Sequence, residues 1–158
     1  MTQYGKRPQP GSKVLRIGRW SEPGRYYILT TVTHLRQPLF QDFRSGRIVV
    51  EEMRRLDRDG YVNSLAWVLM PDHLHWLVEI GEDSLLSKIM MYVKGRAAHR
   101  INHEVHHHGR IWNKGYHDHA LRKEDDVKNI ARYIVTNPLR AGLVQHIGEY
   151  PLWDAVWF

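Results

Sequence analysis

Two histidines that stand two residues apart, His73 and His75, are the residues of this sequence whose spacing most directly suggests chemistry. In a β-strand successive side chains point to opposite faces, so the two imidazoles share one face while Leu74 and Trp76 share the other. Imidazole is the commonest metal ligand and is neutral near pH 7. The pair can therefore hold one divalent ion with a third ligand from elsewhere in the chain. The spacing also fits two half-buried, hydrogen-bonded histidines that bind no metal.

A tyrosine near the end of the chain is the second candidate. Residues 127–135 have the apolar spacing of a helix with one buried stripe, formed by Val127, Ile130, Ala131, Ile134 and Val135. Tyr133 lies about 120° from the centre of this stripe at 100° per residue, so it is not chiefly a core residue. A tyrosine hydroxyl can attack a phosphodiester and keep the strand as a phosphotyrosine. Because a free phenol has a pKa of about 10, a divalent ion on the scissile phosphate would assist this attack.

Length and composition restrict the class of protein. The chain has 158 residues, about one domain, with a net charge of +6 and no cysteine. A basic charge of this size favours polyanionic partners, nucleic acid before membranes. The absence of cysteine excludes a disulfide framework and a thiolate zinc site. No apolar run reaches the ~18 residues of a membrane span, and no signal peptide is recognisable, so the sequence predicts a cytoplasmic protein.

The predicted domain organisation is simple. Residues 1–24 contain five basic side chains among Gly and Pro, and are predicted to form a flexible arm that adds attraction to phosphates. Residues 25–158 are predicted to form a single domain.

The residue patterns predict strands over 26–33, 62–70, 73–80 and 116–122, helices over about 46–59 and 84–103, and a last helix that starts near 124–126. Gly60 is the expected stop of the first helix, and Ser84 the expected N-cap of the second. The first six elements follow the order of a β-α-β-β-α-β ferredoxin-like unit. The sequence therefore predicts an α+β, RRM-like fold, with an antiparallel sheet, helices on one face and an appended C-terminal helix. The other face would be open, and such faces often read single-stranded nucleic acid.

The second predicted helix carries a basic side opposite to its apolar stripe. On that side lie Lys88, Tyr92, Arg96, His99 and His103. This combination suits a nucleic acid backbone with unstacked bases, but an ordinary solvated helix face has the same pattern. A second His-x-His pair, His117 and His119, lies in the last predicted strand and is interpreted as a packed pair.

Three stretches resemble the HUH single-tyrosine transposases. They are Met-Pro-Asp-His-Leu-His at 70–75, Gly-Arg-Ile-Trp-Asn-Lys-Gly-Tyr-His-Asp-His-Ala-Leu-Arg at 109–122, and Ala-Arg-Tyr-Ile-Val-Thr-Asn-Pro-Leu-Arg-Ala-Gly-Leu-Val at 131–144. The last stretch resembles the nucleophile helix of the REP-associated branch of this family. The resemblance extends over about 26–153, nearly the whole predicted domain.

The resemblance implies a role for each residue of a site. Tyr133 would be the nucleophile, and His73 and His75 would bind Mg²⁺ or Mn²⁺. Asn137, one helical turn after the tyrosine, would complete the metal site. Pro138 disfavours the α conformation of the residue before it, which puts this last helical turn in question.

The implied substrate is single-stranded DNA with a foldback hairpin, a palindromic repeat. Cleavage would leave a 5′-phosphotyrosine and a free 3′-OH, so strands could be rejoined without ATP. The protein would act as a monomer or a homodimer. Side chains available to contact the DNA are Lys88, Tyr92, Arg96, Arg100, Arg132 and Arg140.

Three other functions fit parts of the pattern. A non-catalytic ferredoxin-like module that binds single-stranded DNA or RNA explains the charge and the open sheet face, but not the position of Tyr133. A metal-dependent phosphodiesterase that uses water suits the histidine pair, but Asp72 and Glu79 are the only carboxylates close to it in the sequence. A structural domain with surface histidines predicts no effect of metal.

Overall fold

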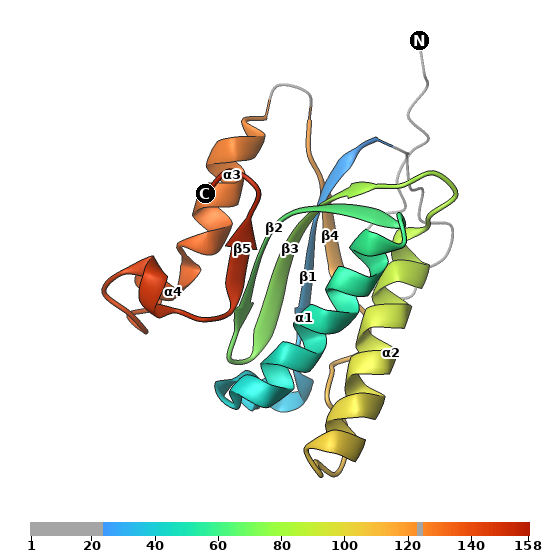
Figure 1. The fold of residues 1–158 in the computed structure, drawn as a ribbon, viewed down its shortest axis with the longest axis vertical. Coiled ribbons are helices and arrows are strands. Elements are labelled where there is room, and N and C mark those ends of the chain that lie inside the picture. Colours follow the sequence, from blue (N-terminus) through green and yellow to red (C-terminus); the bar gives the residue numbers. More distant parts are fainter. Residues whose placement is uncertain (1–23, 123–124) are drawn as a thin grey trace.

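A five-stranded sheet forms the centre of the protein, in a computed structural model that describes residues 24–122 and 125–158. Every pair of neighbouring strands is antiparallel, and the strand order is β4-β1-β3-β2-β5 (Figure 1). The strands are β1 (Tyr26–Val32), β2 (Val62–Met70), β3 (His73–Ile80), β4 (His117–Ala120) and β5 (Trp153–Ala155). The predicted flexible arm lies outside the described residues, apart from Gly24.

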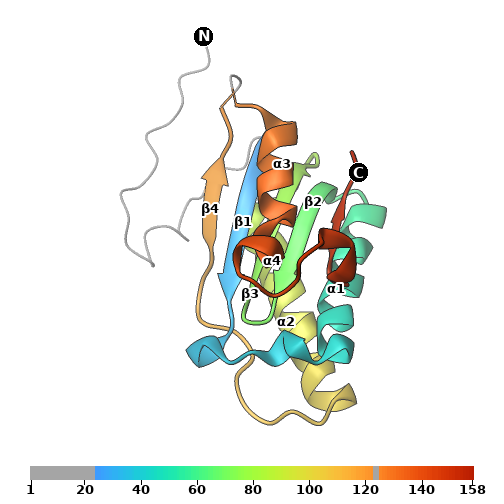
Figure 2. The same ribbon diagram turned by 90° about the vertical axis from the view of Figure 1, so that its left-hand side faces the viewer.

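Helices lie on both faces of the sheet. α1 (Phe43–Arg58) and α2 (Leu86–Glu104) pack on one face, and α3 (Val127–Val135) and α4 (Asn137–Arg140) lie on the other (Figure 1, Figure 2). Short 3₁₀ turns occur at His34–Arg36, Leu39–Gln41 and Ile147–Glu149. The chain order β1-α1-β2-β3-α2-β4 confirms the predicted ferredoxin-like unit. No helix in the described parts of the chain is long and apolar enough to cross a membrane.

Capping contacts set the helix boundaries. α1 begins at Phe43, earlier than predicted, because the Asp42 carboxylate accepts hydrogen bonds from two backbone N–H groups of the first turn, both at 3.3 Å. It ends before Gly60, whose φ of 81° is the left-handed conformation expected of a helix stop. The predicted cap at Ser84 is wrong. Leu85 occupies the cap position of α2, and the Ser84 hydroxyl donates to a backbone carbonyl two residues earlier instead.

The alternation along β3 separates two cores. Leu74 and Trp76 are fully buried against α1 and α2, as predicted. His73, His75 and Leu77 face the other side of the sheet, where Leu77 packs with Ala131, Ile134 and Val135 of α3. The appended helix therefore covers part of the sheet face that the ferredoxin-like unit alone would leave open. It brings the predicted nucleophile helix to the same side as the histidines.

The C-terminal residues complete the sheet. β5 pairs with β2, and the Tyr150 hydroxyl donates to the Leu69 carbonyl oxygen at 2.5 Å. Leu152 packs so closely over Gly46 that a Cβ atom at that glycine would lie 2.6 Å from the leucine side chain. The strand β2 is an interior strand because β5 covers its outer edge.

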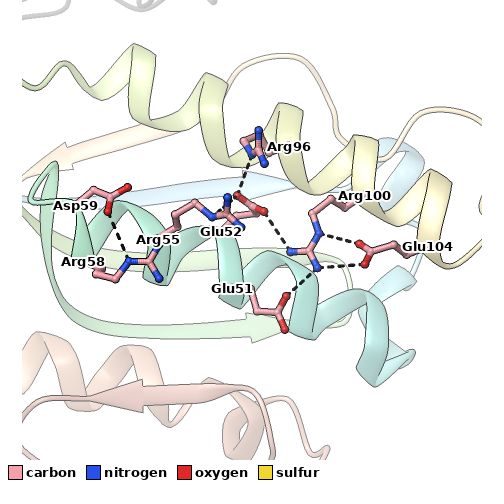
Figure 3. A network of polar contacts seen from close by, with 8 residues as sticks. All are labelled: Glu51, Glu52, Arg55, Arg58, Asp59, Arg96, Arg100 and Glu104. Carbon is pink, nitrogen blue, oxygen red and sulfur yellow. Dashed lines mark hydrogen bonds and ion pairs between the residues drawn. The ribbon is translucent and has the colours of Figure 1, made fainter.

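An ion-pair network joins α1 to α2 (Figure 3). The Glu52 side chain is completely buried, and its carboxylate accepts from Arg96 Nε at 3.3 Å and Arg100 Nη1 at 3.2 Å. Arg100 also pairs with Glu104 at 2.7 Å and Glu51 at 2.9 Å. The hydrogen bonds to these carboxylates, Glu104 first, raise the pKa of Arg100 above its ordinary value. Two residues predicted to contact DNA thus have a structural role.

We expect Arg100→Ala to lower the free energy of unfolding by about 2 kcal/mol, because it leaves the buried Glu52 carboxylate with fewer partners. Chemical denaturation measures this change. Lys88→Ala, on the exposed side of the same helix, is the control and should stay within about 0.5 kcal/mol of wild type. An Arg100→Ala protein with full stability but weakened DNA binding would favour the sequence-based assignment instead.

Candidate active site

The imidazoles of His73 and His75 lie side by side on β3, with ring centroids 4.7 Å apart and planes at 80°. The Nδ1 atom of His73 lies 2.7 Å from Asp72 Oδ1, and the Nδ1 atom of His75 lies 2.9 Å from Thr30 Oγ1. A hydrogen bond at one ring nitrogen is the usual way in which a metal-binding histidine is oriented. Both Nδ1 atoms are engaged in this way, which leaves the Nε2 atoms as ligands. The pair therefore fits a divalent ion.

The electrostatics of the site favour metal binding at neutral pH. Burial, followed by the positive charges of His73 and Arg140, lowers the pKa of His75 from 6.5 to about 4. Burial opposes the ionisation of Asp72, but its hydrogen bond and charge interaction with His73, and then those with Arg36, outweigh this effect and lower the pKa of Asp72. Near pH 7, His75 is thus neutral and Asp72 is ionised.

In metal-free protein kept in EDTA, we expect His75 to titrate near pH 4. Arg140→Gln should raise this pKa part of the way to 6.5, since burial remains the larger cause. Because the folded pKa lies below the unfolded one, neutral His75 stabilises the fold above pH 6.5, and this contribution is lost as the pH falls toward 4. Imidazole NMR signals followed during a pH titration measure both values. A His75 pKa near 6.5 in the wild type would contradict this account.

Sequence reasoning assigned no role to Asp72 or Thr30. Asp72 directly precedes the histidine pair, so its position was a usable signal. Thr30 is 45 residues from His75 and meets it only because the two are direct partners in the β1–β3 ladder. No local pattern could have identified it.

We expect Asp72→Ala to weaken Mn²⁺ binding by about 10- to 100-fold, because the His73 ring loses the carboxylate that orients it. Isothermal titration of the purified protein with Mn²⁺ measures the affinity. Glu79→Ala is a matched control on β3, since this carboxylate bonds to the Asn63 side chain at 3.2 Å, and its removal should leave the affinity unchanged. Equal losses in the two variants would show that charge alone, and not orientation, matters.

Tyr133 lies on the exposed flank of α3, with 66% of its surface accessible, which confirms that it is off the buried stripe. The Arg140 guanidinium lies 3.7 Å from the centre of the tyrosine ring, and its Nη2 donates to the Tyr133 carbonyl oxygen. Its Nη1 donates to Thr136 Oγ1 at 2.6 Å. The charge of Arg140 also acts on His75. One arginine thus contacts the tyrosine and acts electrostatically on His75.

Asn137 begins a new helix. α3 ends at Val135, Thr136 (φ −86°, ψ 4°) lies at the bend, and α4 starts at Asn137. The break expected near Pro138 therefore exists, one residue before Asn137. Within residues 24–122 and 125–158, no three His, Cys, Asp or Glu side chains form a group that could hold a metal. The role of Asn137 as a third ligand stays a prediction.

The residues predicted to contact DNA fall into two groups. Arg132 and Arg140 flank Tyr133, and Arg132 lies 5.5 Å from the centre of the Phe158 ring. The other group consists of α2 residues, on the opposite face of the sheet from the histidines, and comprises Lys88, Tyr92, Arg96 and Arg100. The sheet therefore separates this group from the candidate active site. Its contact with DNA stays a prediction.

The interpretation of the second His-x-His pair as packed is wrong. His117 and His119 are both exposed on the edge strand β4. They lie on the same sheet face as His75, because His117 pairs with Thr30 and Thr30 pairs with His75. The packing was mispredicted because α3 buries β2 and β3 more than β4.

Comparison with known proteins identifies the family of the chain. A family model described as "Transposase IS200 like" matches residues 23–137. The chain belongs to the IS200-like transposase family. A REP-associated tyrosine transposase of Escherichia coli is 27% identical to it over 141 residues, 83% of this chain and 80% of the relative.

Solved structures share the fold of this IS200-like transposase. A REP-associated tyrosine transposase bound to a REP hairpin superposes with a TM-score of 0.70 at 21% identity, over 85% of this chain and 79% of that one. A candidate transposase from Deinococcus radiodurans superposes with a TM-score of 0.54 at 22% identity, over 74% and 93%.

The family match covers the histidine pair, Tyr133 and Asn137. IS200-like transposases are tyrosine DNA transposases, and their activity generally depends on a metal ion. The non-catalytic binding module is therefore not favoured.

Proposed function

We propose that this transposase binds single-stranded DNA that carries a foldback hairpin, and cleaves it with Tyr133 as the nucleophile. One observation carries the proposal. The exposed Tyr133 lies on α3, which packs on the sheet face that carries the oriented His75, although the two residues come from different parts of the chain. The known complex of a relative with a REP hairpin supports the choice of substrate.

The proposed reaction exchanges one phosphate ester for another. The Tyr133 Oη atom attacks the phosphorus of the scissile phosphodiester, and the bond from phosphorus to the 3′ oxygen breaks. The phenol releases its proton to solvent, and the leaving 3′ oxygen takes up a proton to become a 3′-OH. The 5′ phosphate stays on the tyrosine, so the strand can be rejoined in the reverse reaction without ATP.

His73, His75 and Asn137 would hold the Mg²⁺ or Mn²⁺ ion. A divalent ion bound there would neutralise charge on the scissile phosphate and orient it. The other residues act on orientation and charge. Asp72 and Thr30 hold the two imidazoles in place, and Arg140 keeps a fixed positive charge beside the tyrosine ring.

The DNA backbone would be held by arginines near the nucleophile. Arg132 and Arg140 are both exposed and flank Tyr133, so they can neutralise phosphates on either side of the cleaved bond. Lys88, Tyr92, Arg96 and Arg100 would form a second contact region for the hairpin, on the far face of the sheet. The net charge of +6 is in keeping with a polyanionic ligand.

The test uses a hairpin oligonucleotide taken from palindromic repeats near the gene, labelled at either its 5′ or its 3′ end. The purified protein is added with Mn²⁺ or Mg²⁺, or with EDTA, and products are separated on a denaturing gel. We expect a metal-dependent, protease-sensitive shifted band with the 3′ label only, and a free fragment with the 5′ label. Cleavage with both labels unshifted would point to water as the nucleophile. Binding without cleavage would point to a non-catalytic module.

A further inference from the structure

A groove of about 450 Å³ runs between β4 and α3, beside the nucleophile. Tyr133 forms part of its wall, and the exposed His119 of β4 lies in the same lining. Its apolar surface comes from the sheet and from α3, and is formed by Ile28, Leu121, Ile130 and Ile134. Figure 2 shows β4 at the edge of the sheet and α3 in front of the sheet. Neither His119 nor the apolar lining has a role in the cleavage reaction described above.

Strand register places this groove within one nucleotide of the histidine pair. On the α3 face, Ile28 of β1 separates His119 from Leu77, just as Thr30 separates His117 from His75. Neighbouring strands lie about 4.8 Å apart, so β4 is roughly 10 Å from β3 across the sheet. A nucleotide whose phosphate lies at His75 and Tyr133 can therefore extend its base over β1 to β4.

The chemistry of the lining suits a base better than a phosphate. Asp125 and Asp126 stand at one end of the groove, and their negative charge disfavours a phosphate there. Asp125 accepts one hydrogen bond from the Arg122 N–H at 2.7 Å, and Asp126 accepts two from Asn129, at 3.1 and 2.8 Å. A carboxylate has about four acceptor positions, so each can accept further bonds.

The matching group on DNA is the exocyclic amine of adenine, cytosine or guanine, which thymine lacks. The His119 ring can stack on the face of such a base, as aromatic side chains do with unpaired nucleotides. The apolar side chains beneath would exclude water from the base.

We infer that the groove between β4 and α3 binds one unpaired, amine-bearing nucleobase of the nucleotide next to the scissile phosphate. The inference rests on the proposed function, because it takes Tyr133 as the residue that meets that phosphate. It gives His119 a role in selecting the cleavage position.

The test combines protein and DNA changes. The hairpin oligonucleotide is made intact and with an abasic residue on the 5′ side or the 3′ side of the cleavage point. Wild type, His119→Ala and His117→Ala are compared on each DNA by the rate of covalent adduct formation. His117→Ala is the matched control, because it removes an exposed histidine from the same strand and face but not from the groove. Thermal melting confirms that the variants are folded.

We expect His119→Ala to slow the reaction of intact DNA about tenfold, which is the loss of one stacked base. With one of the two abasic DNAs, the wild type should react about as slowly as His119→Ala reacts with intact DNA. On this abasic DNA, His119→Ala should be no slower than the wild type. Replacing the base at that position with thymine should slow the wild type, whereas His117→Ala should show no such coupling. The inference would be overturned if His119→Ala had no effect on the rate. It would also be overturned if the rate losses from His119→Ala and from the abasic residue multiplied when the two changes were combined.

A binding measurement keeps this test separate from that of the proposed function. The same DNAs are titrated into the Tyr133→Phe protein, with and without His119→Ala, and the Kd is measured by fluorescence anisotropy. If the wild type forms no adduct with any DNA, the proposed function fails. The base site is then still upheld if His119→Ala weakens binding of the intact DNA but not of the abasic DNA. If the adduct forms but neither rate nor Kd shows coupling, the base site fails while the proposed function stands.

Discussion

Tyr133→Phe is expected to abolish the covalent adduct and to reduce cleavage of the hairpin by more than about 10³-fold, because the variant lacks the attacking oxygen. The affinity for the hairpin should change little. Binding depends on phosphate contacts and stacking, and phenylalanine keeps the ring that lies against Arg140. A denaturing gel measures the adduct and cleavage, and anisotropy in EDTA measures the affinity.

Tyr61→Phe provides the control for this experiment. Tyr61 is 50% exposed and lies between α1 and β2, and it lines a surface groove with α2 residues rather than the candidate active site. This variant should cleave like the wild type. Cleavage that persists in Tyr133→Phe would make water the nucleophile, and an adduct that persists would place the nucleophile on another residue.

Removing either histidine of the pair is expected to have the second large effect. His73→Ala and His75→Ala should each reduce cleavage by at least about 10²-fold, because a divalent ion contributes several kcal/mol of charge stabilisation and each variant lacks one ligand for it. Hairpin binding in EDTA should be largely retained, because it does not require the metal. Mn²⁺ titration should show a parallel loss of metal affinity.

His99→Ala is the matched control for the histidine variants, since His99 is an exposed histidine of α2 on the other face of the sheet. Its cleavage rate and Mn²⁺ affinity should equal those of the wild type. If His73→Ala or His75→Ala instead lost binding and cleavage to the same extent, together with a lower melting temperature, the histidines would have a folding role.

Local spacing was sufficient for the two central features of the site. The period of two along β3 placed His73 and His75 on one face, because successive strand residues must alternate. The helical period placed Tyr133 off the buried stripe of α3, as its exposure confirms. Both predictions depend only on the repeat of a single strand or helix, because this repeat fixes the direction of each side chain relative to its neighbours in the sequence.

The side chains that orient the site could not be predicted in this way. Thr30 meets His75 through strand pairing across 45 residues. Arg140 of α4 contacts the ring and the backbone carbonyl of Tyr133 of α3, across the bend at Thr136. Contacts of this kind depend on how separate elements pack against each other. The spacing of residues within one element does not predict that packing.

The basic helix α2 and the histidine-containing strand β4 also show which properties follow from the sequence and which from the tertiary structure. The sequence by itself placed Arg96 on the side of its helix away from the apolar stripe, and His117 and His119 on one face of their strand. Only the tertiary structure decided that Arg96 and Arg100 bond to the buried Glu52, and that the histidines remain exposed. The physical reason is that periodicity sets the direction of a side chain within its element, whereas burial and pairing depend on which element packs opposite.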